Sequence, residues 1–326
     1  MCSVFQNFYQ KKKAEEPFDS GHFFYEKSAR RYFIQKKVPA PKHIAFIMDG
    51  NRRFAKKNKK KPAWGHRMGT RTIDKILHGA YLSGVEHVTI YAFSTENFKR
   101  DKNEVDNIFE LLEKTIFDLS ADAHISKNIK IRMIGDASHL PEKIKSSFLE
   151  LEEKTKGNNK MYLNVAVAYG GRQDIAQAFL KIVQKPEAFF EKRNGSERGR
   201  INNNSGSCGS NNNSDRAGAE NIGNLVSDKF ISKYLFPFSD EIVPDVDLLI
   251  RTGDERRTSN FLPWQANGNS CVICFHPKFW PEFNEKDLFS TFRQYQKIRD
   301  GMETNNKIRA EKINNFLKTL PDAKKK

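Results

Sequence analysis

The chain has 326 residues, of which 38% are hydrophobic, and it carries a formal net charge of +16. A chain of this length suits one large α/β domain or two small ones, and the modest hydrophobic content indicates polar appendages around an ordinary core. The sequence has no apolar run near the ~20 residues that a membrane span needs and no signal-peptide core after Met1, so we expect a soluble or peripheral protein on the cytosolic side.

The first segment, residues 1–40, is a basic and aromatic arm. Phenylalanine, tyrosine, arginine and lysine crowd into the stretch from Phe23 to Lys37. A helix of this composition could lie on an anionic membrane surface. The same residues could equally form an arm that packs against the main domain or stays partly disordered, and the sequence does not choose between these interpretations.

Residues 41–185 alternate between strand-like and helical patterns. The strand patterns are Ile44–Met48, Val85–Ala92, Ile129–Ile134 and Met161–Ala168, and the helical patterns are Met68–Ser83, Glu104–Ala123, Pro141–Lys154 and Asp174–Val183. The second helix carries Val105, Ile108, Phe109, Leu112, Ile116, Phe117 and Leu119 on one apolar side. Alternating strands and helices predict a single α/β domain with a central, mainly parallel sheet flanked by helices.

Asparagine and serine runs interrupt this pattern between residues 186 and 224. Such polar, low-complexity sequence cannot bury enough apolar surface to order itself, so we predict a disordered surface insertion inside one domain. The pattern resumes with a helix from Leu225 to about Tyr234, followed by strands at Val246–Ile250 and Cys271–Phe275.

The last predicted strand contains a lone C-x-x-C, Cys271-Val-Ile-Cys274. Metal sites usually need a second pair of cysteines or histidines at ligand spacing, so two apolar-like strand residues are the favoured interpretation. The chain then ends in a lysine-rich tail, residues 302–326, which we expect to be mobile from about Arg309.

Three of the predicted strands end in residues that handle phosphate or metal. In an open parallel α/β sheet, ligands bind outside the carboxyl ends of the strands. Three such ends, rich in arginine and with a carboxylate at Asp49, predict a site for a strongly anionic ligand. The three segments are Asp49-Gly50-Asn51-Arg52-Arg53, then Ser94-Thr95-Glu96-Asn97 with Arg100, and finally Arg251-Thr252-Gly253 with Arg256-Arg257-Thr258-Ser259.

Asp49 is the predicted metal ligand of this site. A carboxylate beside a diphosphate commonly holds Mg²⁺, which takes one or two protein oxygens and keeps several waters. Gly50 allows the backbone to approach closely, and Arg52 and Arg53 can add bidentate contacts to phosphate. Taken alone, Asp-Gly after a buried strand is more often a turn, but the Asn-Arg-Arg that follows favours a functional site.

The arginines after the third strand fit the same site. Arg251, Arg256 and Arg257 keep their charge and would repel one another unless a bound anion or solvent lay between them. A loop whose arginines are solvated is therefore the alternative to an anion-binding site. Familiar phosphate motifs are missing, because the sequence has neither G-x-x-x-x-G-K-[ST] nor G-x-G-x-x-G and no two adjacent aspartates. The lysine run 56–61 is more typical of a solvated loop than of a nucleic-acid site.

Taken in order, the motifs resemble those of the cis-prenyltransferases, the family of undecaprenyl and dehydrodolichyl diphosphate synthases. The most distinctive motif runs from His43 to Ala55, H-I-A-F-I-M-D-G-N-R-R-F-A. The others follow in family order and are Gly65-His66, Tyr91–Arg100, Ile134–Asp136, Ala168–Arg172, Asp247–Gly253, Arg257–Gln265 and Phe279–Phe283. The similarity covers residues 41–301 apart from the insertion, which predicts one cis-prenyltransferase domain.

The resemblance implies a reaction, in which isopentenyl diphosphate elongates an allylic diphosphate, typically farnesyl diphosphate. The product would be a long-chain cis-polyprenyl diphosphate for dolichol-type carriers and protein glycosylation. Asp49 would hold Mg²⁺, and Asp49, Ser94 and Asn97 are the implied catalytic residues. The implied substrate-binding residues are Gly50, Asn51, Arg52, Arg53, Phe54, His66, Thr95, Glu96, Phe98, Arg100, Arg251, Arg257, Thr258, Ser259, Arg299 and Gly301.

The resemblance also divides the three strand ends between the substrates. The end at Asp49 would hold the allylic diphosphate and the metal, and the end at Arg251 would hold isopentenyl diphosphate. The end at Ser94 would lie between them, where the bond and the proton change. The growing chain would occupy a hydrophobic tunnel between sheet and helices, lined partly by Glu104–Ala123, although ordinary core packing also explains that helix.

Three positions refine the resemblance. Ser270 stands where bacterial members carry a second metal-binding glutamate, so Asp49 and the substrate phosphates would bear more of the metal binding. Arg52 stands where bacterial members have glycine and eukaryotic members often have arginine. Arg299-Asp300-Gly301 resembles the family's Arg-x-Gly motif, which completes a neighbouring subunit's site, and it implies a homodimer that is active alone.

The resemblance places the protein in the cytoplasm or on the cytoplasmic side of the endoplasmic reticulum membrane, with peripheral contact through the arm. A non-catalytic subunit of a heteromeric cis-prenyltransferase is the first alternative, but such partners lose the Asp-Gly-Asn-Arg signature that this chain keeps. A nucleic-acid-binding protein is the second. Its lysines cluster in loops and tails without a recognisable reading module, so we expect no nucleic-acid partner.

Overall fold

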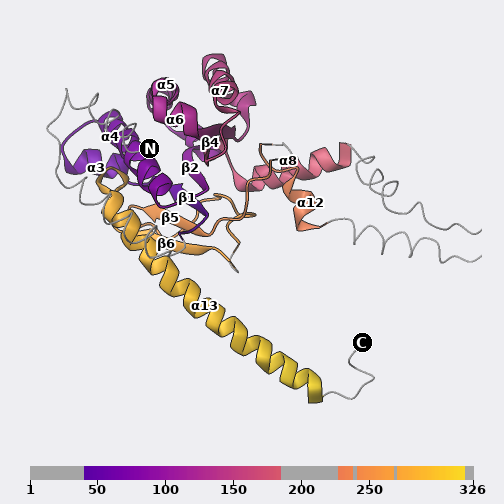
Figure 1. The fold of residues 1–326 in the computed structure, drawn as a ribbon. Helices are drawn as coiled ribbons and strands as arrows, with labels where there is room; N and C mark the ends of the chain where they lie inside the picture. The colour runs from indigo at the N-terminus through magenta and orange to yellow at the C-terminus, as the bar shows by residue number, and fades with distance from the viewer. Residues whose placement is uncertain (1–39, 185–226, 238–240, 268–269, 320–326) are drawn as a thin grey trace, which may run out of the picture.

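The computed structural model describes residues 40–184, 227–237, 241–267 and 270–319 (Figure 1). The predicted N-terminal arm and the asparagine- and serine-rich insertion at 186–224 lie outside the described residues, as does the end of the chain from residue 320. The description that follows therefore concerns the α/β domain that the strand and helix patterns predicted.

Six strands form one sheet, and every pairing between them is parallel. Their order across the sheet is β3-β4-β2-β1-β5-β6. All six were predicted, with ends that shift by two residues or fewer, so the α/β class with a mainly parallel sheet is confirmed. The strands are β1 His43–Ile47, β2 His87–Ser94, β3 Ile129–Ile134, β4 Met161–Tyr169, β5 Leu248–Thr252 and β6 Val272–His276.

Helices connect the strands and cover the sheet (Figure 1). The α-helices are α3 Asn51–Lys57, α4 Pro62–Leu82, α5 Lys102–Ala121, α6 Ala123–Asn128, α7 Glu142–Thr155, α8 Gly171–Gln184, α12 Asp228–Ser232 and α13 Glu285–Thr319. The 3₁₀ turns are η2 Thr95–Lys99, η3 Ala137–His139 and η4 Trp280–Glu282. Sequence patterns did not predict α13, which continues as a helix through Arg309, where we expected a mobile tail.

Side chains of the sheet alternate between two apolar clusters, as the period of two along a strand requires. Ile44 and Phe46 of β1 belong to the larger cluster, to which α4, α5, α7 and the start of α13 contribute. Ala45 and Ile47 of the same strand belong to a second cluster with Phe261. Because β1 is buried along its whole length, its sequence is continuously apolar and not alternating, as is typical of parallel strands covered on both faces.

Helix α5, the predicted wall of a tunnel, is only partly buried. Ile116 and Leu119 are buried, and Val105, Ile108, Phe109 and Leu112 pack against the larger cluster from partly exposed positions. Phe117, predicted on the apolar side, is instead 71% exposed. A helix on the surface of a domain buries only about a third of its circumference, and Phe117 lies outside the buried part of α5. The tunnel stays a prediction.

Cys271 and Cys274 belong to opposite faces of the sheet. The first is buried in the second apolar cluster, and the second packs against the larger one. Burial raises the pKa of the Cys271 thiol to about 11 and also raises the pKa of Cys274. Cys274 lies within β6 and Cys271 directly precedes it, and both pack among apolar side chains, as expected for apolar-like residues of a strand.

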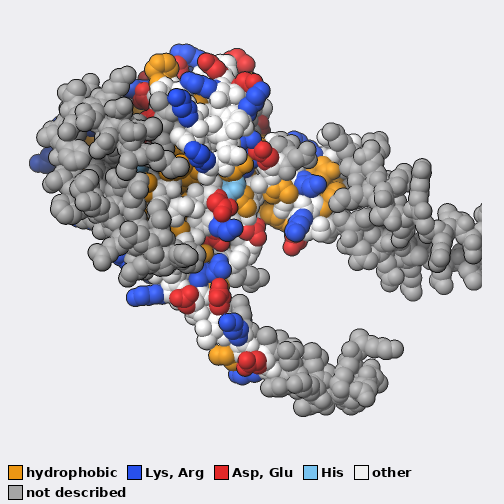
Figure 2. Space-filling view, in the orientation of Figure 1, with side chains coloured by type: hydrophobic (Ala, Val, Ile, Leu, Met, Phe, Trp, Pro, Cys, Tyr) orange, Lys and Arg blue, Asp and Glu red, His pale blue; other side chains and the backbone are white. Residues whose placement is uncertain are grey.

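Two surface features bear on membranes and partners. None of the helices among the described residues combines the length and apolarity required to cross a bilayer. Helix α8 nevertheless exposes a short apolar stripe, in which Phe179, Leu180 and Val183 are 51%, 57% and 73% exposed. Figure 2 shows apolar side chains gathered over this part of the molecule.

Gly65 allows α3 and α4 to cross at very short range. A Cβ at this position would lie 2.1 Å from the backbone oxygen of Asn51. We expect Gly65→Ala to lower the free energy of unfolding by about 2 kcal/mol, because α4 must move away from α3. Denaturant unfolding measures this change, and Gly157→Ala is the control because nothing lies within 4 Å of its Cβ. Equal unfolding midpoints for the two variants would contradict the expected clash.

Candidate active site

The three predicted strand ends are neighbours at the carboxyl edge of the sheet. Strand β1 pairs with β2 on one side and with β5 on the other. The end that carries Asp49 is therefore the central one, and the expected position of the Ser94 end between the other two is wrong. Strand order depends on where each crossover helix packs, which the order of motifs along the chain does not reveal.

The Asp49 carboxylate lies between two guanidinium groups. Its Oδ2 accepts a hydrogen bond from Nη2 of Arg251 at 2.7 Å, and its Oδ1 lies 3.2 Å from Nη2 of Arg53. Burial alone would raise the pKa of Asp49, but the hydrogen bond from Arg251 and the two positive charges outweigh it and lower the pKa. The backbone oxygen of Asp49 accepts from Trp280 N at 2.9 Å and from Thr252 Oγ1 at 2.8 Å. Asp49 is thus an ionised and firmly held carboxylate.

Two glycines keep the backbone around Asp49 free of side chains. Gly50 has φ +104°, and a Cβ there would lie 2.7 Å from the Phe279 ring. Gly253 has φ +88°, and its Cβ would lie 2.7 Å from Nη2 of Arg53. Only glycine suits both positions, and the approach of a phosphate to the backbone at Gly50 stays a prediction.

Arg251 is buried and connects Asp49 to the loop after β5. Its side chain is 4% exposed. While Nη2 binds Asp49, Nη1 donates to Oγ of Ser259 at 2.7 Å and to the backbone oxygen of Arg257 at 2.6 Å. Its Nε has no hydrogen-bond partner among the described residues. Arg251 therefore fixes the relative position of Asp49 and Ser259.

Glu255 completes what we call the Asp49 cluster, which consists of Asp49, Arg53, Arg251, Glu255, Arg257 and Ser259. Oε1 of Glu255 lies 3.6 Å from Nη1 of Arg53, and its other oxygen accepts from Nη1 of Arg257. Arg256 and Arg257 are both exposed, but only Arg257 pairs with Glu255. We expected an anion or solvent to relieve the repulsion between the arginines, and the structure adds two carboxylates of the protein itself. Three arginines against two carboxylates still leave a positive charge.

A second group, the Glu104 cluster, consists of Arg52, His66, Arg100 and Glu104. Oε1 of Glu104 accepts from Nη1 of Arg100 at 2.9 Å and lies 3.9 Å from Nε2 of His66. Its Oε2 lies 3.6 Å from Nη1 of Arg52. Burial, reinforced by the charge of Arg100, lowers the pKa of His66 to about 4, so His66 is neutral near pH 7. This cluster also retains an excess positive charge.

The predicted catalytic residues Ser94 and Asn97 are joined by one hydrogen bond where the turn η2 begins. The Asn97 Oδ1 accepts from the backbone N–H of Ser94 at 3.1 Å. This contact gives the Asn97 side chain a local structural role, which is independent of any chemistry. It leaves the Asn97 amide nitrogen available as a donor, so a role in the reaction stays a prediction.

Most of the other predicted binding residues have packing or local roles in the structure. Phe54 stacks on Trp64 with ring centroids 5.3 Å apart, and Phe98 packs edge-on against Phe93. Three more make local hydrogen bonds: Asn51 donates to Met48 O, Thr95 donates to Glu96, and Thr258 accepts through its backbone from Phe261.

Arg299 lies at the opposite edge of the sheet within its own chain. Its Nη1 donates to Tyr295 Oη at 3.1 Å and lies 3.7 Å from Oδ1 of Asp247, which precedes β5 and pairs with the start of β1. A Cβ on Gly301 would meet nothing within 4 Å. The structure does not bring either residue to Asp49 of the same chain, and a role in a neighbouring subunit stays a prediction.

The donor set around Asp49 is compatible with Mg²⁺ only if phosphate takes part. Among the described residues, no group of three histidine, cysteine, aspartate or glutamate side chains could hold a metal ion. Asp49 offers an ionised carboxylate, but both of its oxygens contact arginines. Mg²⁺ accepts one protein carboxylate together with water and phosphate oxygens, which suits this site.

Glu104 and Glu255 were not among the predicted site residues. Glu104 had a detectable signal, because Arg100 and Glu104 are four residues apart at the start of a helix and can pair. Glu255 lies beside Asp254 inside the arginine-rich segment after β5, and the sequence does not show which of the two carboxylates pairs with the arginines. Neither signal identifies a site by itself, since most such carboxylates pair on open surfaces.

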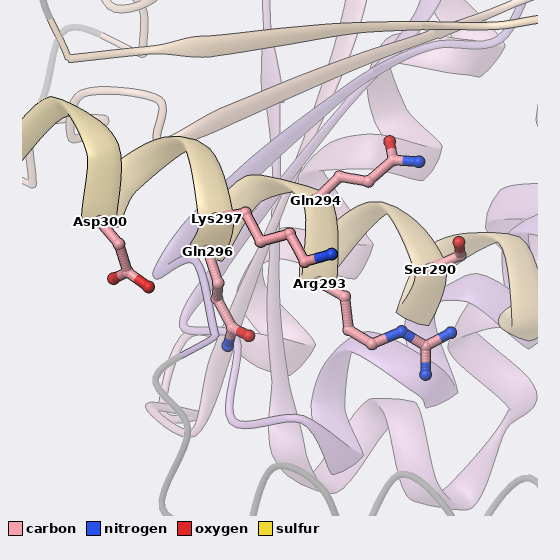
Figure 3. Close-up of a pocket in the computed structure, with 6 residues that line it drawn as sticks. All are labelled: Ser290, Arg293, Gln294, Gln296, Lys297 and Asp300. Carbon is pink, nitrogen blue, oxygen red and sulfur yellow. The ribbon is translucent and has the colours of Figure 1, made fainter.

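A separate hollow lies along α13, and Figure 3 shows its lining. The side chains that line it are Ser290, Arg293, Gln294, Gln296, Lys297 and Asp300. They come from one helix and include none of the predicted site residues. This hollow is therefore not part of the candidate active site.

Comparisons with known proteins show which proteins the chain resembles. The family model described as putative undecaprenyl diphosphate synthase matches residues 47–302. A tritrans,polycis-undecaprenyl-diphosphate synthase (geranylgeranyl-diphosphate specific) of Methanosarcina mazei is 38% identical over 90% of this chain and 88% of that protein. An enzyme of the same name from Archaeoglobus fulgidus is 36% identical over 84% of this chain and 96% of that protein.

Solved structures show the same relationship. The lavandulyl diphosphate synthase of Lavandula x intermedia, in complex with dimethylallyl diphosphate, has a TM-score of 0.62 at 30% identity, covering 79% of this chain and 95% of that one. A probable undecaprenyl diphosphate synthase of Campylobacter jejuni has a TM-score of 0.56 at 26% identity, covering 79% and 96%. With a family model across most of its domain, the chain belongs to the undecaprenyl diphosphate synthase family of cis-prenyltransferases.

Proposed function

We propose that this cis-prenyltransferase adds isopentenyl diphosphate units to an allylic diphosphate and makes a long-chain cis-polyprenyl diphosphate. The observation that carries the proposal is the arrangement of two positively charged clusters around one ionised carboxylate, Asp49, at the central strand end. Two diphosphates bring a large negative charge to this edge of the sheet. The excess arginine charge there would hold both and stabilise the diphosphate that leaves.

The two clusters divide the substrates between them. The basic residues of the Glu104 cluster, which are Arg52, His66 and Arg100, bind the allylic diphosphate together with Gly50, Asn51 and Arg53. Arg251, Arg257 and Ser259 bind isopentenyl diphosphate. The allylic C–O bond breaks, the double bond of isopentenyl diphosphate attacks the freed carbon, and a proton leaves to give the new cis double bond. Ser94 and Asn97 orient the reacting groups from the end of β2.

Mg²⁺ would supply positive charge to the leaving diphosphate, and Asp49 is the residue that would hold it. Arg251 and Arg53 keep the Asp49 carboxylate ionised and in place until then. Because both arginines also belong to the phosphate subsites, a bound diphosphate would draw them from Asp49 and free its oxygens. Metal binding and diphosphate binding should therefore depend on each other.

We propose farnesyl diphosphate as the allylic substrate, with geranylgeranyl diphosphate as the competing candidate. The second is supported by the names of the archaeal relatives, which are specific for geranylgeranyl diphosphate. We further propose that the product is of the dolichol type and serves protein glycosylation. The enzyme would then work in the cytoplasm or on the cytoplasmic side of the endoplasmic reticulum.

A homodimer is the proposed assembly, with Arg299 and Gly301 reaching the neighbouring subunit's site. The exposed apolar stripe on α8 supports association, because contiguous apolar surface commonly marks an interface. Peripheral membrane contact through residues 1–40 is proposed from their composition alone. A nucleic-acid partner is not proposed, because the site arginines pair with carboxylates inside the two clusters.

One incubation tests activity, autonomy and substrate together. The purified chain is mixed with labelled isopentenyl diphosphate, Mg²⁺ and either farnesyl or geranylgeranyl diphosphate, and the products are sized. We expect long-chain products from the chain alone, with a higher kcat/KM for the farnesyl substrate. Absence of product until a second, non-identical subunit is added would favour the heteromeric alternative.

A further inference from the structure

Glu104 lies among basic groups from three different elements. Arg52 comes from α3, His66 from α4 and Arg100 from the residue after η2, while Glu104 belongs to the first turn of α5. The Glu104 side chain is only 19% exposed. Arg100 is likewise 27% exposed, so its contact with Glu104 is partly shielded from water and charge interactions there are stronger than on an open surface, whereas Arg52 is 57% exposed.

The charges of this cluster show what Glu104 does in the absence of a ligand. Arg52 and Arg100 carry two positive charges, His66 is neutral near pH 7, and Glu104 supplies one negative charge. An anion that binds these two arginines must compete with Glu104 for their positive charge and for the Arg100 N–H group that donates to Glu104. It must also tolerate the nearby negative charge of the displaced carboxylate.

This competition matters for repeated elongation. Each condensation leaves inorganic diphosphate in the allylic subsite, and the lengthened chain can occupy that subsite only after the inorganic diphosphate departs. A subsite that held diphosphate as tightly as its arginines allow would slow every cycle, because product release would then limit turnover.

We propose that Glu104 is an internal counter-ion of the allylic subsite, which takes over Arg52 and Arg100 as inorganic diphosphate leaves and so promotes its release. Glu104 is a positioning residue in this role, since it acts on the arginines and not on the reacting carbons. The inference rests on the proposed function and adds a means of release to it.

Titration of inorganic diphosphate into the full chain tests the proposal without any turnover. Glu104→Gln keeps the size and the acceptor oxygen of the side chain but removes its charge. We expect this variant to bind inorganic diphosphate about tenfold tighter, the scale of one charge-assisted hydrogen bond. Glu110→Gln, the same change at an exposed position of α5, should leave the affinity unchanged.

Enzyme turnover provides a second measurement of how Glu104 affects the binding of inorganic diphosphate. In the Glu104→Gln enzyme, added inorganic diphosphate should inhibit about tenfold more strongly and steady-state kcat should fall, while the first condensation in a single turnover keeps its rate. A merely structural role would slow the single turnover and weaken the binding of inorganic diphosphate.

Unchanged or weaker binding of inorganic diphosphate to Glu104→Gln would overturn the inference. If that variant does not fold, Glu104→Asp decides, because the shorter carboxylate loses reach to Arg52 and should tighten binding to a smaller extent. Tighter binding in a chain that makes no polyprenyl product would contradict the proposed function but not the counter-ion. Full activity without tighter binding would contradict the counter-ion alone.

Discussion

Replacing Asp49 with asparagine should lower Mg²⁺-dependent prenyl transfer by roughly a thousandfold. Asparagine has the same shape but cannot offer a charged oxygen to Mg²⁺. It also leaves the buried Arg251 without its carboxylate, although the amide oxygen still accepts one hydrogen bond. Steady-state turnover with labelled isopentenyl diphosphate measures the loss, and a titration of Mg²⁺ should show that a higher concentration restores little activity.

Asp254→Asn is the matched control for this change. Asp254 is exposed, lies in the same loop as the arginines and has φ +60°, a conformation that asparagine also tolerates. Its activity should match that of the unaltered enzyme. If Asp49→Asn retained most of its Mg²⁺-dependent turnover, the assignment of Asp49 as the metal-binding carboxylate would be wrong.

The sheet and the position of the site could be predicted because both depend on local sequence. Each buried strand is a short apolar run, and ligands gather at the carboxyl ends of parallel strands. Arg251 lies 202 residues after Asp49 and 8 residues before Ser259 in the sequence, and its side chain donates hydrogen bonds to both. This proximity was expected, because the residues belong to neighbouring strand ends.

The arrangement within the site could not be predicted because it depends on packing between distant elements. The central place of β1 follows from where the crossover helices pack, and the meeting of Glu104 with Arg52 and His66 follows from the crossing of α3, α4 and α5. A single sequence contains no signal for such distances. The position of Arg299 was unpredictable for the same reason, because its sequence motif does not indicate at which edge of the sheet the residue lies.

Some residues of the short functional motifs also have a structural role. The resemblance implies a catalytic role for Ser94 and Asn97, and the Asn97 side chain also accepts a hydrogen bond from the backbone of Ser94. Phe54 was assigned to the substrate, yet its ring stacks on Trp64 between α3 and α4. A residue type that suits a reaction can equally suit the scaffold that holds the reacting groups, and only the contacts separate the two uses.

Arg251→Lys should lower kcat/KM for isopentenyl diphosphate by about a hundredfold, mainly through a higher KM. The guanidinium uses one nitrogen for Asp49 and another for Ser259 and the backbone of Arg257. A lysine ammonium is a single point and cannot span both sides of this buried position. Steady-state kinetics at saturating allylic substrate measures the change, and Arg256→Lys, at an exposed position of the same loop, should leave kcat/KM unchanged.

A double-mutant cycle with Ser259→Ala separates this bridge from a simple loss of charge. If Arg251 acts by holding Ser259 in place, the two substitutions share one interaction, so the double variant should lose little more kcat/KM than Arg251→Lys alone. Independent roles would instead make the two losses multiply. Additive free-energy losses would therefore contradict the bridge, because the buried guanidinium would then serve Asp49 and the substrate without organising the loop after β5.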